Sequence, residues 1–176
     1  AYKYNQYLRR SMNDLGLLYL IEKNDYEKAI NLIKNAAFAE YPCAQNNYGL
    51  LLEFNSNDIA KAEHFYERST EHNFALGYFN LGRLNEEKGK INEAVDFYMK
   101  ASKYENEPLM FNNFRHYDKR LVISITFVIC FTNLKLSHYY FSQSNFDESK
   151  YYFIKAFDKL IIHESILNYK FSYKYE

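Results

Sequence analysis

The sequence of 176 residues contains five Gly, two Pro, two Cys and no Trp. So little Gly and Pro supplies too few turns for an all-β sandwich. Two cysteines cannot build the disulfide framework of a small secreted domain. The chain also has no excess charge, because 22 Lys and Arg balance 22 Asp and Glu. This balance argues against a broad basic surface for nucleic acid and against an acidic tail.

The chain has no long apolar run. Its longest, Leu121–Phe131, is far shorter than the ~20 residues of a membrane-spanning helix, so we expect a buried helix there. The chain begins Ala1-Tyr2-Lys3-Tyr4, without Met and without the apolar core of a secretory signal. We therefore expect a cytoplasmic protein, and the simplest interpretation is a fragment of a longer protein.

Hydrophobic residues make up 48% of the chain, and the aromatics are 19 Tyr and 15 Phe. These proportions are typical of a soluble globular protein, and its core is built from single-ring aromatic side chains. The length is typical of one domain. With so few turn residues, the composition favours an all-α fold.

Small residues recur along the first hundred residues at a nearly constant period. Glycines stand at 16, 49 and 82, alanines at 29, 62 and 94, and small residues at 36, 69 and 101. A fixed period of about 33 residues is the signature of a repeat architecture. A Gly inside a helix costs about 1 kcal/mol relative to Ala, so it needs a packing reason. We expect each Gly to let a second helix approach closely, with the Ala as the reciprocal flat position.

Each repeat divides into two helices. Apolar residues at helical spacing predict a first helix over about Leu8–Glu22 and a second over about Tyr26–Phe38. The polar joint between them is short, and similar joints lie near residues 55–58 and 88–90. Joints this short make the two helices antiparallel neighbours.

The repeat resembles the tetratricopeptide family, whose signature is Leu-Gly, an aromatic three residues on, and then Ala, aromatic and Ala. The segment from Ala36-Ala37 through Ala44 to Asn47-Tyr48-Gly49 is similar in length and lettering to the junctions of Sel1-like repeats. The resemblance is strongest over Leu8–Lys103. It implies a right-handed α-solenoid of antiparallel helix pairs, in which the first helix of each pair lines the concave side.

The resemblance also organises the rest of the chain. We expect three helix pairs in residues 1–103, an irregular connection in 104–120, and a degenerate fourth pair with a long first helix in 121–160. In that pair Ser137 stands where the other repeats have Gly. Residues 161–176, apolar at Ile162, Ile166 and Phe171, are expected to form a C-terminal capping helix over the open end.

Motifs that carry chemistry are missing from the sequence. It contains no Gly-rich phosphate loop, no H-E-x-x-H, no C-x-x-C and no G-x-S-x-G. Cys43 and Cys130 lie in apolar neighbourhoods and are interpreted as small buried hydrophobes. We therefore expect no enzymatic activity, no metal and no cofactor.

The resemblance implies which residues of the first helices face inward, where a partner would bind. They are Asn13, Asp14, Leu17, Asn46, Asn47, Leu50, Glu53, Phe79, Asn80, Arg83 and Glu86. An Asn side chain has one acceptor and two donors, so a row of them could hold the main chain of an extended peptide. Because the whole chain is rich in Asn, a coincidental row remains an open alternative.

The sequence thus favours a scaffold that binds a peptide or amphipathic helix of another protein in its concave groove. The alternative is a structural or regulatory module of a larger enzyme or assembly, which it contacts through the apolar 121–131 helix. An RNA-binding helical repeat is the weakest of the three, because positive charge does not run along one face.

Overall fold

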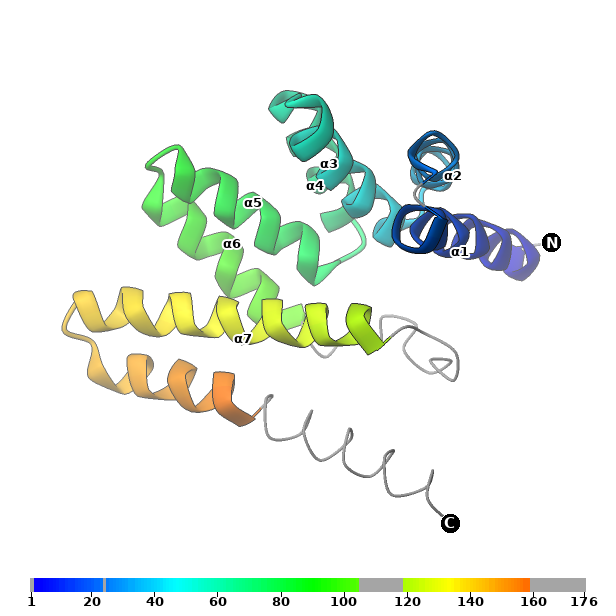
Figure 1. Ribbon diagram of the computed structural model, residues 1–176. Helices are drawn as coiled ribbons and strands as arrows, with labels where there is room; N and C mark the ends of the chain where they lie inside the picture. Colours follow the sequence, from blue (N-terminus) through cyan, green and yellow to red (C-terminus); the bar gives the residue numbers. More distant parts are fainter. Residues whose placement is uncertain (1, 24, 105–118, 159–176) are drawn as a thin grey trace, which may run out of the picture. The chain divides into compact units, whose positions relative to one another are not determined.

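The computed structural model describes residues 2–23, 25–104 and 119–158, and within these ranges all regular structure is helical (Figure 1). The chain forms two compact units, residues 1–84 and 85–176, with the division inside one helix. The expected all-α fold of paired helices is confirmed.

The first unit consists of two helix pairs and the start of a third. Its helices are α1 (Tyr2–Leu18), a π-helical turn (Tyr19–Lys23), α2 (Tyr26–Phe38), α3 (Pro42–Ser56), α4 (Ile59–Thr70) and most of α5 (Ala75–Glu87). The bounds of α2 agree with those expected from the sequence. The first helix starts earlier than expected, at Tyr2, and its last turn widens into the π-helix.

The second unit contains the end of α5, then α6 (Ile91–Lys103), α7 (Lys119–Ser142) and a further helix over residues 146–158. α7 and the helix of residues 146–158 lie side by side and antiparallel (Figure 1). The expected connection is described only at its edges, because residues 105–118 lie outside the described ranges. The expected capping helix of residues 161–176 lies outside them entirely. Among the helices that the structure describes, none is long and apolar enough to cross a membrane.

Aspartates begin the second helix of the first two pairs. The side chains of Asp25 and Asp58 accept hydrogen bonds of 3.2 Å from the backbone N–H groups of Lys28 and Lys61. Such N-caps satisfy backbone donors that the helix itself leaves unpaired. Lys90 holds the equivalent place before α6 and makes no side-chain cap bond.

Residues in the left-handed backbone conformation end several of the helices. They are Glu40, Asn57, Asn73, Gly89 and Ser144, with φ angles of 62°, 51°, 56°, 75° and 58°. Glu40 and Asn73 follow the second helix of a pair and stand one repeat apart. Asn57, Gly89 and Ser144 follow the first helix of a pair. A left-handed residue reverses the chain at once, which is why joints of two to four residues suffice.

The repeated glycines lie where two helices approach most closely. A Cβ built on Gly16 would stand 2.6 Å from Ile33 Cγ1 and 3.1 Å from the carbonyl oxygen of Ala29. A Cβ on Gly49 would stand 2.6 Å from Tyr66 Cε1 and 3.2 Å from the carbonyl oxygen of Ala62. Both alanines are fully buried. These matching surroundings confirm that the repeat spacing in the sequence records close packing within the first two pairs.

Candidate functional site

Three of the asparagines expected on the inner face are buried between helices. The side chain of Asn47 donates a 2.9 Å hydrogen bond to Oδ1 of Asn13, and that of Asn80 donates one of 2.8 Å to Oδ1 of Asn46. Asn13, Asn46 and Asn80 are at most 6% exposed. In both pairs the partners stand 34 residues apart, so each bond joins the first helix of one repeat to the first helix of the next. The asparagines thus fix the register between repeats.

Two of the expected acidic residues bind a tyrosine and a basic side chain. Glu53 Oε2 accepts hydrogen bonds from the Tyr66 hydroxyl (2.7 Å) and from Arg83 Nη2 (2.6 Å). Glu53 is 7% exposed, and Arg83 stands on the first helix of the following repeat. Burial, followed by the bond to Glu53, raises the pKa of Tyr66, so the phenol stays protonated and remains a donor.

Glu86 makes the same kind of cluster in the second unit. Its carboxylate accepts a hydrogen bond of 2.7 Å from the Tyr98 hydroxyl and one of 2.6 Å from Lys135 Nζ. Burial alone would raise the pKa of Glu86, but the bonds from Lys135 and Tyr98 outweigh it and lower that pKa. Glu86 therefore stays ionised at neutral pH and ties α5 to α6 and α7.

Asp14 is half-buried and lies beside Asn13, which accepts the hydrogen bond from Asn47. Its carboxylate lies 3.5 Å from Arg10 Nε and accepts 3.2 Å from the side chain of Asn13. Burial raises the pKa of Asp14, and Asn13 and Arg10 oppose that rise. The side chain is therefore engaged within α1, which limits the groups that it can offer to a partner.

The remaining inner positions keep part of their surface open. Leu17, Asn47, Leu50 and Phe79 are half-buried, and the first three belong to α1 and α3. Asp14, Arg83 and Glu86 are half-buried as well, so the accessible part of the predicted surface combines three apolar side chains, one amide and three charged groups that are already ion-paired. The sequence did not reveal which asparagines pair with each other. The signal was the doublet Asn46-Asn47, in which one residue bonds forward and the other backward along the repeats.

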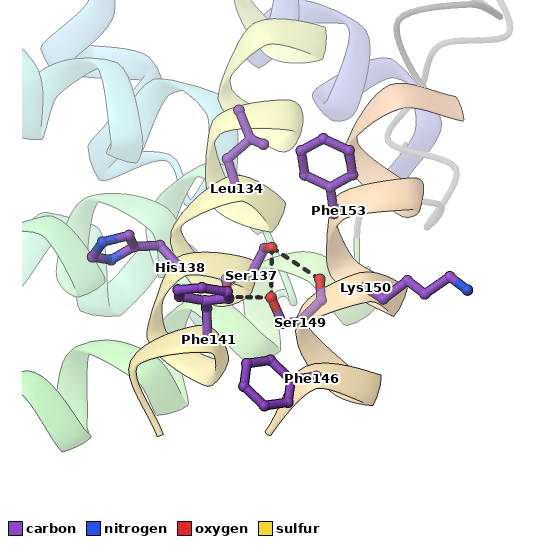
Figure 2. Close-up of a pocket in the computed structure, with 8 residues that line it drawn as sticks. All are labelled: Leu134, Ser137, His138, Phe141, Phe146, Ser149, Lys150 and Phe153. Carbon is purple, nitrogen blue, oxygen red and sulfur yellow. Dashed lines mark hydrogen bonds between the residues drawn. The ribbon is translucent and has the colours of Figure 1, made fainter. Parts of the chain in front are cut away.

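A groove lies between α7 and the helix of residues 146–158 (Figure 2), with a volume of about 570 Å³. Its lining residues are Leu134, Ser137, His138, Phe141, Phe146, Ser149, Lys150 and Phe153. Ser137 and Ser149 form its floor, where each hydroxyl donates 2.9 Å to the backbone carbonyl of the other residue. This groove was not expected from the sequence. Its signal is the helical spacing of Phe146 and Phe153.

The two cysteines carry little reactivity. Burial raises the pKa of the Cys43 thiol to about 11, so it is protonated at neutral pH. Cys130 is buried, as expected, whereas Cys43 keeps part of its surface exposed. The Cys130 thiol donates a hydrogen bond of 3.3 Å to the backbone carbonyl of Ala156. Among the described residues, no group of His, Cys, Asp and Glu is arranged to hold a metal ion.

Comparisons with known proteins agree with this geometry. Residues 75–108 match the family model of the tetratricopeptide repeat. The crystal structure of MamA is similar with a TM-score of 0.50 and 18% identity, covering 89% of this chain and 81% of that one. The crystal structure of a Sel1 repeat protein from Oxalobacter formigenes is similar with a TM-score of 0.52 and 19% identity, covering 84% and 71%. No curated protein matches the sequence. At these identities, the two structures bear on the fold alone.

Proposed function

Because this chain is a helical-repeat protein of the tetratricopeptide and Sel1-like kind, we propose that it is a scaffold that binds another protein. The partner's peptide or helix lies on the inner face of the first helices. The scaffold carries out no chemistry of its own. It acts by holding the partner in place.

The observation that carries this proposal is the equivalent placement of Leu17 and Leu50. Both stand one residue after a repeat glycine, one on α1 and one on α3, and both are half-buried. Asn47 lies beside Leu50 and donates one of its two N–H groups to Asn13. Its side-chain oxygen and its second N–H group can therefore bind a peptide main chain. An apolar strip edged by an amide suits an amphipathic or extended guest segment.

The polar network behind this strip supports the same proposal. The Asn13–Asn47 and Asn46–Asn80 bonds and the ion pair between Glu53 and Arg83 hold consecutive first helices in register. A surface built on helices held in this way needs little ordering when a partner binds, so less binding energy is lost.

The alternative is a module that contacts a larger assembly through the apolar helix around residues 121–131. Phe131, at the end of that segment, is 53% exposed, which supports such a contact. Binding on the inner face and contact through the 121–131 helix differ in which substitutions abolish the interaction.

Affinity capture with the purified chain tests the proposal. We expect a bound protein that survives 0.5 M salt and is lost when Leu17 and Leu50 are both changed to Glu. Ala60→Glu, at an exposed position of α4, is the matched control and should retain the partner. Retention by the double Leu variant together with loss on Phe131→Glu would favour the alternative. Salt-sensitive capture of nucleic acid would contradict both.

A further inference from the structure

Two stripes of exposed side chains border the α7 groove, the groove between α7 and the helix of residues 146–158. Leu134, His138 and Phe141 follow one another on α7 at steps of four and three residues. On the next helix the stripe consists of Phe146, Lys150, Phe153 and Phe157, at steps of four, three and four. These steps place each set on one helix face. Antiparallel helices with facing apolar stripes form a seat for a third helix.

The aromatic side chains of these stripes are open to solvent. Phe141, Phe146, Phe153 and Phe157 are 62%, 60%, 50% and 47% exposed. Phe141 and Phe146 contact each other edge to face, with ring centroids 5.6 Å apart. Figure 2 shows them at one end of it, with Leu134 and Phe153 at the other. A cluster of exposed rings this dense marks an interaction surface rather than ordinary surface.

The second repeat shows what occupies the corresponding face. Ser137 faces the backbone of Ser149 as Gly49 faces that of Ala62, which aligns the fourth pair with the second. In this alignment Leu134 takes the place of Asn46 and Phe141 that of Glu53. Asn46 and Glu53 are covered by the next helix, α5.

Within α5 the two contacting residues are three apart in sequence. Asn80 bonds to Asn46, and Arg83 bonds to Glu53. A helix seated in the same way on the fourth pair would place two residues, three apart, against Leu134 and Phe141. Because these two positions are apolar in the fourth pair, the incoming residues must be apolar as well.

We propose that the α7 groove binds one amphipathic helix of a partner protein, laid as α5 lies on the second pair. Its apolar stripe packs on Leu134, Phe141 and Phe153, and an acidic side chain on its flank pairs with Lys150. The occupant is thereby a helix with apolar residues at spacings of three and four and acidic residues beside them.

Charge decides the flank. The groove lining contains Lys150 and His138 and no carboxylate. The chain's own residues 159–176, whose greater part the sequence predicts to cap the open end, lie outside the described ranges and contain three Lys against two Glu. They therefore complement Lys150 poorly, whereas an acidic helix complements it well.

The test uses the full chain and three synthetic 18-residue peptides, measured by fluorescence anisotropy. One peptide has leucines along a single stripe flanked by Glu, the second has Lys in place of Glu, and the third has Ser in place of Leu. We expect the first to bind and the third not to bind. Phe141→Ser or Phe153→Ser should weaken binding more than tenfold. Tyr151→Ser, at a 58% exposed position on the same helix but outside the groove lining, should leave it unchanged.

Exchange of charge tests the flank independently. Lys150→Glu should weaken the Glu peptide about threefold and strengthen the Lys peptide by a similar factor, as expected for an exposed ion pair. Circular dichroism checks that each variant stays folded, which is expected because the altered side chains are exposed.

Four results of the peptide-binding measurements would overturn the proposal. They are no binding of the Glu peptide, equal binding by the Phe141 and Phe153 variants, a preference for the Lys peptide, and tighter peptide binding after Ile166→Glu with Phe171→Glu. The last would assign the groove to the chain's own C-terminal residues. Concentration-dependent dimerisation that Phe153→Ser abolishes would assign it to a second copy and would also overturn the proposal. None of these results bears on Leu17 and Leu50, so the proposed function is tested separately.

Discussion

Asn46 and Asn80 bind each other across two consecutive repeats, with the amide of Asn80 donating to Oδ1 of Asn46 at 2.8 Å. Both side chains are almost fully buried, so water cannot replace either partner easily. The bond therefore contributes to specificity as well as to stability, because it can form in only one register of α5 against α3. The inner face owes its regular spacing to this pair and to its counterpart, Asn13 with Asn47.

The first prediction concerns this pair. Asn46→Ala and Asn80→Ala should each lower the free energy of unfolding by about 1–3 kcal/mol, because each leaves a buried amide without its partner. The double variant should cost clearly less than the sum, with a coupling of at least about 0.5 kcal/mol. Urea denaturation of the four proteins measures the cycle. Strict additivity would show that the two amides do not depend on each other.

Gly49→Ala is the second prediction, and its sign is the test. On an open helix surface this change stabilises by about 1 kcal/mol. Here the new methyl would meet the ring of Tyr66 and the carbonyl oxygen of Ala62, so we expect a loss of about 1–3 kcal/mol. Tyr66 is fully buried and held by Glu53, which prevents the ring from moving aside. A raised thermal midpoint would refute the close approach of α3 and α4.

Much of this fold could be predicted from the sequence because packing imposed a visible pattern. Gly16 and Gly49 predict where the helices of a pair contact each other, and the polar joints predict where the chain reverses direction. The π-helical turn at Tyr19–Lys23 could not be predicted in this way, because one extra residue in a turn leaves the apolar spacing almost unchanged. Only one part of the Ser137–Ser149 contact could be predicted. The repeat spacing places Ser137 where the other pairs have Gly, but it does not encode that each hydroxyl donates to the backbone carbonyl of the other residue.

The third prediction supplies a missing cap. Lys90 stands where Asp25 and Asp58 cap the earlier helices, and it makes no cap bond itself. Lys90→Asp should stabilise the protein by about 1 kcal/mol, because an aspartate there can accept from the first turn of α6. Thermal denaturation measures the gain. Lys88→Asp, in the preceding joint, is the matched control for the change of charge and should give no comparable increase.

The fourth prediction concerns acid. The side-chain bond to Lys28 lowers the pKa of Asp25, and the bond to Lys61 likewise lowers that of Asp58. Because both pKa values lie lower in the folded state, the caps stabilise the protein above the unfolded pKa of 3.8. That contribution is lost as the pH falls through the lowered values. Asp58→Asn keeps a cap acceptor without a charge, so its stability should fall less between pH 6 and pH 2.5 than that of the wild type. Denaturant midpoints at the two pH values measure the difference, and parallel losses would contradict the assignment.

The candidate site was less predictable than the fold. The inward register could be read from the repeat, but whether Asn46 or Asn47 is accessible depends on which neighbour each one meets. That is decided by residues 34 positions away. The α7 groove depended on knowing that Leu134 and Phe141 remain uncovered, since apolar residues at those spacings are equally typical of a buried helix face.

Site-specific photo-crosslinking from the inner face tests the central claim most directly. A photoreactive phenylalanine analogue replaces Leu50 in one protein and Ala60, exposed on α4, in another. We predict a discrete protein adduct from position 50 that is lost on Leu17→Glu, and no such adduct from position 60. Equal labelling from both positions, or an adduct to nucleic acid, would contradict the account.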